Sequence, residues 1–316
     1  MARILANDGI DPIGKKLLED AGFTVDTQTV PQDQLVAALQ NYDGLTVRSA
    51  TKVRKELIDA CPNLKLIGRG GVGMDNIDVE YARSKGITVV NTPAASSLSV
   101  AELVFSHLFT GVRFLQDANR KMPVEGSTKF NDLKKAYAKG VELRGKTIGI
   151  IGFGRIGRET AAVALGLGMN VLAYDLFPFS GNITLNLTLG IKVEIPVTTV
   201  SLEEVIANSD FISLHTPFAD QPILGAAEFA AMKNGVGVVN CSRGGTIDEA
   251  ALIEALNSGK VSFAGLDVFD NEPTPAAEIL SHPKISLTPH IGASTNEAQE
   301  RIGTELANLI IDHFKG

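Results

Sequence analysis

The amino-acid sequence predicts an α/β protein made of two parallel-sheet domains of the Rossmann or flavodoxin type. Short apolar runs alternate with segments of helical periodicity almost from the first residue, which is the rhythm of successive βαβ units. This rhythm runs through residues 1–93, is interrupted by a long apolar helical segment, and starts again at "KTIGIIG". The chain has 316 residues, which exceeds the size at which a single core usually stops growing. Two domains are therefore expected.

Each half contains enough signals for a complete sheet. In the first half, helical patterns near 13–21, 32–39 and 79–85 separate short apolar strands. The expected strands are "RILA", "FTVDT", "GLTV", "LKLIG" and "GITVV" in the first half, and "KTIGIIG", "NVLAYD", "IKVEI", "DFISLHT", "GVGVVN", "VSFAGLDVF" and "ISLTPH" in the second.

Two long helices are expected at the ends of the second half. The segment "SSLSVAELVFSHLFTGVRFLQDANRKM" predicts one long helix, and Ser99 and Glu102 have the spacing of a capping box at its start. Residues 293–314 have an amphipathic helical pattern, and we expect this helix to return to the first domain because domain ends often lie close together. Residues 1–93 plus 293–316 are expected to form a substrate-binding domain. Residues 94–292 are expected to form a nucleotide-binding domain that is inserted into it.

Composition excludes several classes of function. The formal net charge of −7 opposes binding to nucleic acid. No run approaches the roughly 20 apolar residues that span a bilayer, and the start has no secretion signal. Two cysteines are too few for a disulfide framework and fit a reducing compartment, so a cytoplasmic protein is expected. No metal site is expected.

The stretch "IGIIGFGRIGRE" has the pattern of a dinucleotide-binding turn. Gly152, Gly154 and Gly157 follow an apolar strand and precede a helical segment, as in G-x-G-x-x-G. The first glycine of this pattern allows a sharp turn, the second lets the backbone approach a pyrophosphate, and the third lets helix and strand pack closely. Asp175 ends the next expected strand, where a carboxylate accepts hydrogen bonds from ribose hydroxyls and repels a 2′-phosphate. The sequence therefore predicts NAD rather than NADP.

Five histidines are candidates for proton transfer. His215 and His290 both follow an expected strand near a proline, and open α/β sheets bind ligands at the carboxyl ends of their strands. Periodicity cannot choose between these two. His107 is interpreted as a packed or interface residue, His282 as a turn residue and His313 as a tail residue.

Arg243 and Glu272 also follow expected strands. The guanidinium of Arg243 could form a forked contact with a carboxylate or carbonyl, or it could pair with an acid at the domain edge. Glu272 is by default a solvated loop acid. Their residue types alone leave both interpretations open.

Two loops of the first domain form a candidate anion site. Arg48, Ser49 and Lys52 lie close together after "GLTV", and the glycine-rich "GRGGVGMDN" follows the next strand. Basic side chains beside the backbone N–H groups of such a loop are an anion-binding arrangement, although basic residues can also be simply solvated. The candidates in the glycine-rich loop are Gly71, Val72 and Gly73.

Taken together, the motifs resemble the D-isomer-specific 2-hydroxyacid dehydrogenases. The motifs "GRGGVGMDNID", "GKTIGIIGFGRIGRE", "LHTP", "NCSRGGTIDEAAL", "GLDVFDNEP" and "TPHIGAST" occur in this order and extend over nearly the whole chain. Two stretches, "TVRSATKV" and "NCSRGGTIDE", are most similar to the branch of the family that acts on D-3-phosphoglycerate. The resemblance implies NAD-dependent oxidation of a 2-hydroxy acid. The alternatives are a reductase for glyoxylate, hydroxypyruvate or lactate-type acids, and an NAD-sensing protein of the corepressor type.

The resemblance also implies roles for individual residues. Arg243 would orient the substrate carboxylate and carbonyl, and His290, paired with Glu272, would move the proton of the C2 hydroxyl. This implication chooses His290 over His215. Arg48, Ser49, Lys52 and the glycine-rich loop would meet the phosphate. The implied nucleotide contacts are Gly152, Gly154, Arg155, Ile156, Gly157, Asp175, Thr216, Pro217, Cys241, Ser242, Asp267, Gly292, Ala293 and Val72.

The family further implies a homodimer, or a higher homo-oligomer, built largely through the long helix. Many relatives carry C-terminal regulatory domains that bind serine, and such a domain is not expected here. In "KFNDLKKAYAKG" relatives place basic or aromatic residues that reach a neighbouring subunit's phosphate. This segment has Lys134 and Lys135 but no tryptophan, so that contact is left open.

Overall fold

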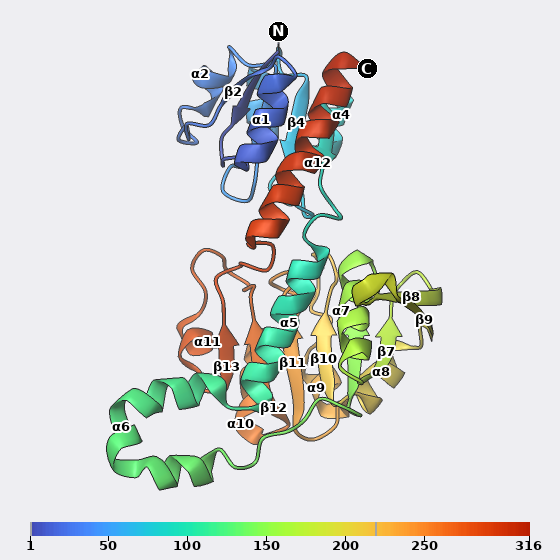
Figure 1. Ribbon diagram of the computed structural model, residues 1–316. Helices are drawn as coiled ribbons and strands as arrows, with labels where there is room; N and C mark the ends of the chain where they lie inside the picture. The colour runs from blue at the N-terminus through green and yellow to red at the C-terminus, as the bar shows by residue number, and fades with distance from the viewer. Residues whose placement is uncertain (1, 219) are drawn as a thin grey trace. The chain divides into compact units, whose positions relative to one another are not determined.

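The protein is described by a computed structural model that covers residues 2–218 and 220–316. Its contacts divide the chain into two compact units, Met1–Ser99 with Ala293–Gly316, and Val100–Gly292. The sequence places the first boundary at residue 93, in the loop before helix α5 (Ser97–Val112). Each unit contains a parallel sheet and helices, so the predicted fold class is confirmed (Figure 1).

The first unit has a five-stranded sheet in the order β2-β1-β3-β4-β5, which is the flavodoxin-like order. All neighbouring strands pair in parallel. Alternation of these strands with helices gives the βαβ rhythm seen in the sequence. The elements are β1 (Arg3–Ala6), α1 (Pro12–Asp20), β2 (Thr24–Asp26), α2 (Leu35–Leu39), β3 (Gly44–Val47), α3 (Lys55–Ala60), β4 (Leu66–Arg69), α4 (Val79–Ser84), β5 (Thr88–Asn91) and α12 (Asn296–Lys315).

Helix α12 brings the end of the chain onto the first unit. It lies beside α1 (Figure 1), and a side chain on Gly14 would overlap the backbone carbonyl of Gly303. The buried face of α12, which includes Leu306 and Ile310, joins a core cluster with Ile4 of β1. The amphipathic pattern of residues 293–314 therefore reflects burial against this sheet and α1.

The second unit has a six-stranded parallel sheet in the order β13-β12-β11-β10-β6-β7. Strand β7 lies on one side of β6, and β10, which comes later in the chain, lies on the other side. The carboxyl ends of β6 and β10 are therefore a topological switch point, where open sheets bind ligands. The elements are β6 (Thr147–Ile151), α7 (Arg155–Gly166), β7 (Asn170–Tyr174), α8 (Leu202–Asn208), β10 (Phe211–Leu214), α9 (Ala226–Ala231), β11 (Val236–Asn240), α10 (Glu249–Ser258), β12 (Val261–Leu266), α11 (Ala277–Ser281) and β13 (Ile285–Leu287), together with α5.

The segment that follows β7 forms a hairpin outside this sheet. Strand β8 (Ser180–Asn186) pairs in antiparallel fashion with β9 (Lys192–Thr198). The expected strand "IKVEI" therefore exists, but it does not extend the parallel sheet. Ile183 and Val197 turn inward and join the core that includes α7, and this local burial explains why the pair folds back on itself.

The prediction of one long helix after residue 96 is wrong. The chain forms α5 and then α6 (Leu115–Ala136), bent by 54°. Phe114, at the break, has a left-handed backbone with φ of 57°, which no helix continues through. Its ring instead packs 5.9 Å from the ring of Tyr137. The predicted capping box is also wrong, because Ser99 lies inside α5 and its hydroxyl is 2.9 Å from that of Thr295.

Among the described helices, none by itself has both the length and the apolar composition needed to cross a membrane. The bent pair α5 and α6 meets those two criteria only when taken together.

Candidate active site

The glycine turn joins β6 to α7 at the switch point of the second sheet. Gly152 has φ of 95°, and a side chain there would overlap the carbonyl of His215. A Cβ on Gly157 would overlap the Gly152 carbonyl oxygen, so this position also requires glycine. An added Cβ at Gly154, by contrast, would meet no described atom within 4 Å. Among the described residues no side chain caps α7, so its first N–H groups can bind an anion.

Asp175 follows β7 and lies against the same turn. Its Oδ2 accepts a hydrogen bond from the Phe153 N–H at 2.6 Å, and its Oδ1 accepts one from the Phe177 N–H at 2.9 Å. These bonds fix the carboxylate, and each oxygen keeps a second lone pair for another donor. The position fits the ribose-binding role that the sequence implies.

His215 and Thr216 follow β10. His215 Nε2 is 2.9 Å from Ser213 Oγ, and burial lowers the pKa of its imidazole to about 3. His215 is therefore neutral at physiological pH and is a poor proton acceptor. The Thr216 Oγ1 atom is buried and has no hydrogen-bond partner among the described residues. Since buried polar groups normally have partners, this hydroxyl fits a ligand contact beside the glycine turn.

Asn240 ends β11 and organises the loop that carries Arg243. Its amide nitrogen donates to the Arg243 carbonyl at 2.9 Å and to Thr246 Oγ1 at 3.0 Å. Its Oδ1 accepts from the N–H and hydroxyl of Ser242 at 3.0 and 2.7 Å. The guanidinium of Arg243 thus projects from a backbone that is fixed on both sides. Burial raises the pKa of the neighbouring Cys241 thiol well above its usual value, so this thiol stays protonated.

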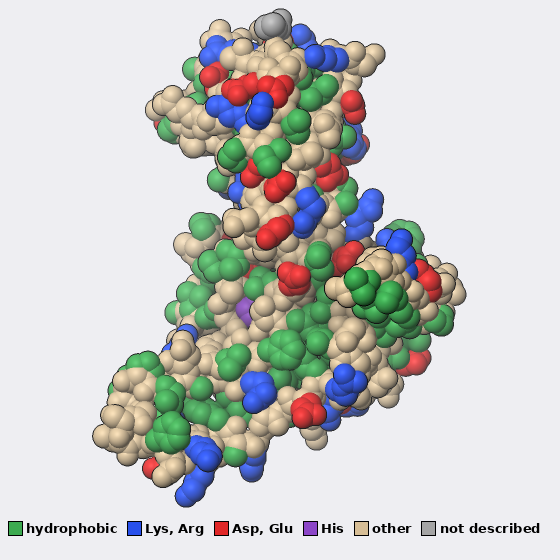
Figure 2. Space-filling view, viewed as in Figure 1, with side chains coloured by type: hydrophobic (Ala, Val, Ile, Leu, Met, Phe, Trp, Pro, Cys, Tyr) green, Lys and Arg blue, Asp and Glu red, His purple; other side chains and the backbone are tan. Residues whose placement is uncertain are grey.

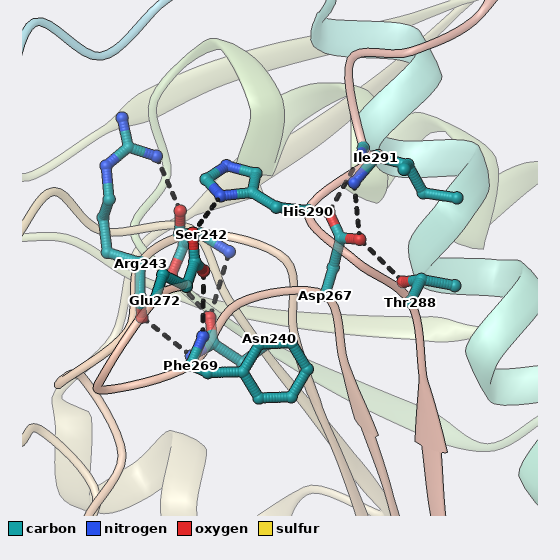
Figure 3. Close-up of polar contacts among 10 residues, drawn as sticks. Asn240, Ser242, Arg243, Asp267, Phe269, Glu272, Thr288, His290 and Ile291 are labelled. Carbon is teal, nitrogen blue, oxygen red and sulfur yellow. Dashed lines mark hydrogen bonds and ion pairs between the residues drawn. The ribbon is translucent and has the colours of Figure 1, made fainter. Parts of the chain in front are cut away.

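Glu272 and His290 form a pair next to this loop (Figure 3). Glu272 Oε2 lies 2.8 Å from His290 Nδ1, and Glu272 Oε1 accepts from the Phe269 N–H at 3.1 Å. The two side chains are 35% and 44% exposed, so the pair is open to a ligand. A side chain on Gly244 would overlap the Phe269 carbonyl, which shows that the loops after β11 and β12 are in contact. With Nδ1 donating to the carboxylate, Nε2 of His290 remains available to accept a proton.

His290 stands in a tight turn that a buried carboxylate holds. The backbone of His290 is left-handed, with φ of 55°. Asp267 is 1% exposed; its Oδ1 accepts from Thr288 Oγ1 at 2.6 Å and from the Ile291 N–H at 2.8 Å. Its Oδ2 accepts from the Gly292 N–H at 2.8 Å. Asp267 therefore anchors the chain on both sides of His290.

In the first unit, the loop after β3 is hydrogen-bonded to the loop after β4. The Asn76 amide donates to the carbonyls of Arg48 and Thr51 at 2.9 and 2.7 Å. Asp8, just after β1, accepts from the N–H groups of Arg48 and Thr51 at 2.7 and 3.1 Å. The backbone around Arg48 is therefore fixed, while the Lys52 side chain is exposed.

The glycine-rich loop offers fewer free N–H groups than its sequence suggests. The Gly71 N–H donates to Thr92 Oγ1 at 2.7 Å, so it is not available to an anion. The Val72 carbonyl accepts from the Asn91 amide at 2.7 Å, which fixes the loop. Val72 and Gly73 are the remaining backbone candidates there.

The structure brings together Arg243, Glu272, His290 and Asp267 within the second unit, next to the switch point. Sequence reasoning missed the supporting polar residues. Their only sequence signal is a polar residue at or directly after the end of an apolar strand. The candidates that lie in the first unit are Arg48, Ser49, Lys52, Gly71, Val72, Gly73 and Ala293, and the supporting residues that were missed are Asp8, Asn76, Asn240 and Thr288.

The glycine turn, the carboxylate after β7 and the doubly wound sheets define a dinucleotide-binding α/β protein. Residues 105–292 match the family model described as D-isomer specific 2-hydroxyacid dehydrogenase, NAD binding domain. The chain belongs to this family, and its second unit is the family's NAD-binding domain.

Individual relatives carry different names. The chain is 44% identical over 315 residues to hydroxypyruvate reductase from Thermotoga maritima, covering 98% of this chain and 97% of that protein. It is 41% identical over 319 residues to D-3-phosphoglycerate dehydrogenase from Rattus norvegicus, covering 100% of this chain but only 57% of that relative's length. The structure of D-lactate dehydrogenase from Aquifex aeolicus, complexed with NAD and lactic acid, matches with a TM-score of 0.79 and 30% identity, covering 99% of this chain and 96% of that one.

Proposed function

We propose that the protein uses NAD to oxidise D-3-phosphoglycerate to 3-phosphohydroxypyruvate, the first step of serine biosynthesis. The observation that carries the proposal is the His290–Glu272 pair, 2.8 Å apart, in the unit that contains the dinucleotide turn. A spectrophotometric assay of NADH, with a panel of D-2-hydroxy acids and their keto partners with and without phosphate, tests it. If NAD bound and no acid were oxidised, an NAD-sensing protein would be the better interpretation.

The second unit has groups that fit a bound NAD. The open space at Gly154 and the uncapped start of α7 would receive the pyrophosphate, and Asp175 would accept hydrogen bonds from the ribose. The unpartnered hydroxyl of Thr216 would find a partner in the same ligand. When bound, NAD supplies the acceptor for the hydride that leaves C2 of the substrate.

His290 would act as the general base. Its Nδ1–H donates to Glu272, which leaves Nε2 to take the proton of the C2 hydroxyl. The Glu272 carboxylate orients the ring and stabilises the positive charge that appears on it. Arg243 would bind the substrate carboxylate with its planar, forked guanidinium. These contacts place the hydroxyl and the base in a reactive geometry, which is where most of the rate would originate.

The identity of the acid depends on whether a phosphate is recognised. Arg48 and Lys52 follow β3, beside the loop after β4, and supply positive charge for such a group. The similarity to the phosphoglycerate dehydrogenase from Rattus norvegicus covers the whole of this chain. The second candidate substrate is hydroxypyruvate, because the Thermotoga maritima relative has nearly the same length as this chain.

Loss of the two basic side chains should separate these substrates. In the variant Arg48→Ala/Lys52→Ala, we expect KM for 3-phosphoglycerate to rise by about tenfold or more, because each charged hydrogen bond to a ligand contributes about 1.5 kcal/mol or more. KM for an unphosphorylated hydroxy acid and for NAD should change little. Lys65→Ala is the matched control, since Lys65 precedes β4 at the opposite end of the same sheet. An equal rise in KM for both acids would contradict a phosphate site.

Asp175 should determine which nicotinamide cofactor is used. In Asp175→Ser, the catalytic efficiency with NAD should fall by roughly tenfold or more, because charged hydrogen bonds to the ribose are lost, while use of NADP should rise as repulsion of its phosphate disappears. Initial rates with both cofactors measure the ratio. Glu159→Gln, which removes an exposed carboxylate from α7, is the control. A variant that still prefers NAD as strongly as the wild type would contradict the assignment.

We also propose that the protein forms a homodimer through α5 and α6. Helix α6 exposes several large apolar side chains, and Figure 2 shows apolar groups gathered on the segment that α6 forms. Such patches mark interaction sites. Sedimentation velocity tests the proposal. The exposed apolar residues are Leu115, Met122, Val124 and Phe130.

The two cysteines fit a reducing compartment. Cys61 and Cys241 are both buried and free. We propose that the protein is cytoplasmic, and the free thiols support this proposal because they persist in that compartment.

A further inference from the structure

A buried histidine on α5 is hydrogen-bonded at both ring nitrogens. His107 is 2% exposed; its Nδ1 is 2.9 Å from Ser286 Oγ and its Nε2 is 3.1 Å from Thr288 Oγ1. Thr288 Oγ1 is in turn 2.6 Å from Oδ1 of Asp267. A continuous chain of polar groups therefore runs from α5 to the carboxylate that holds the turn of His290.

The chemistry of these groups determines where the protons lie. An ionised carboxylate only accepts, so the Thr288 hydroxyl donates to Asp267. The oxygen of Thr288 must then accept from His107, which requires a proton on Nε2. In a neutral ring with Nε2–H, Nδ1 is an acceptor, and Ser286 donates to it.

The alternative is a doubly protonated ring, which would also satisfy Thr288. Burial lowers the pKa of His107, although the charge of Asp267 acts in the opposite direction. The ring also packs closely on the backbone of β12, because a Cβ on Gly265 would lie 2.7 Å from the His107 Cγ and 3.1 Å from its Nδ1. The ring is thus a neutral, closely packed donor to Thr288.

We infer that His107 is a positioning residue for the proposed reaction: its Nε2–H fixes the Thr288 hydroxyl on Asp267, and Asp267 holds the turn from His290 to Gly292. The inference rests on the proposed function, because that function makes His290 the base. Leucine has a similar size and would suit a buried apolar helix face, so hydrogen bonding is the property that distinguishes the imidazole. The imidazole is explained by the hydrogen bond it donates.

Without this bond the Thr288 hydroxyl can rotate away from Asp267. Asp267 would then keep only its two backbone donors, Ile291 and Gly292. These donors bind the chain after His290, whereas Thr288 lies before it. The orientation of His290 toward Glu272 would therefore become less well defined, and the expected consequence is a lower kcat rather than a loss of folding.

Five variants test the inference. His107→Leu and Thr288→Val should each lower kcat by about tenfold, because the free energy of one hydrogen bond corresponds to about this factor and the lost bond acts on the orientation of the base. The double variant should also lose only about tenfold, because both changes break the same chain of contacts. His107→Gln, which restores a donor near Thr288, should recover most of the activity. Ser286→Ala is the matched control and should stay within about twofold of wild type, because it leaves the Nε2–H in place.

The protonation state gives a readout that does not depend on substrate. Nitrogen-15 NMR of histidine-labelled protein should show a neutral His107 ring with its proton on Nε2, and the His107→Leu spectrum assigns the signal. Thermal unfolding of each variant establishes that it is folded, and NADH fluorescence shows that the nucleotide still binds.

The outcomes separate the two proposals. If the wild type oxidised no hydroxy acid, the proposed function would fail. If the wild type were active and the effects of His107→Leu and Thr288→Val multiplied to about a hundredfold, or Ser286→Ala lost as much activity as His107→Leu, the inference would be overturned. A ring protonated on Nδ1 would also overturn it.

Discussion

Replacing His290 with asparagine is expected to lower kcat by about 10²–10⁴-fold, the usual contribution of a positioned general base. An asparagine amide can still donate to Glu272, but it cannot accept the hydroxyl proton. Asparagine is the appropriate substitution because His290 has φ of 55°, a conformation that asparagine tolerates and alanine rarely adopts. Steady-state kinetics measure the loss, and NADH fluorescence should show that the glycine turn still binds nucleotide.

Two further variants make this result specific. Glu272→Gln keeps an oxygen that can accept from the Phe269 N–H but removes the charge that balances the imidazolium, so a smaller loss of kcat is expected. His282→Asn changes a half-buried histidine whose Nε2 is 3.4 Å from Asn257 Oδ1, and its kinetics should match the wild type. Turnover of His290→Asn within about tenfold of wild type would show that another group takes the proton.

The glycine turn could be predicted because its requirements are local. Gly152 needs a positive φ and Gly157 needs close packing on Gly152, and both follow from a strand–turn–helix segment only a few residues long. The order of strands along the chain likewise follows from periodicity. These parts of the fold depend on neighbouring residues in the sequence, and the sequence therefore contains their signals.

The break at Phe114 and the β8–β9 hairpin could not be predicted in the same way. The left-handed conformation of Phe114 accompanies a ring contact with Tyr137, which is distant in sequence. The strand "IKVEI" has a correct local pattern, but its partner is decided by the burial of Ile183 and Val197 in the second unit. Tertiary packing decides which backbone conformation and which strand partner a segment takes, and the periodicity of the sequence does not contain that information.

The choice between the two strand-end histidines shows the same limit at the level of chemistry. Both follow an apolar strand and lie near a proline, so their local sequences are equivalent. The structure separates them through their surroundings. The imidazole of His215 lies beside Ser213, and burial lowers its pKa to about 3, whereas His290 lies beside the Glu272 carboxylate. A partner 18 residues away in the chain is invisible to a local pattern.

Arg243 should affect the hydroxy acid more than the cofactor. In Arg243→Lys we expect the catalytic efficiency for the acid to fall by about 10²-fold or more, because an ammonium cannot reproduce two parallel hydrogen bonds of about 1.5–3 kcal/mol each, even though it keeps the charge. None of the Asn240 contacts with this loop involves the Arg243 side chain: they are made to the Arg243 carbonyl, to Thr246 Oγ1 and to Ser242, so they should survive the substitution and hold the loop in place.

The kinetic pattern distinguishes a carboxylate clamp from a structural arginine. A clamp should raise KM for the acid and lower kcat, because the carboxylate also orients C2 toward His290, while KM for NAD and the unfolding temperature should change little. Arg83→Lys is the control, since Arg83 is an exposed residue of α4 in the first unit, and its guanidinium pairs with Glu80 at 3.0 Å. If Arg243→Lys lowered the unfolding temperature and left KM for the acid unchanged, Arg243 would be an edge residue of the domain. The other interpretation left open by the sequence would then be correct.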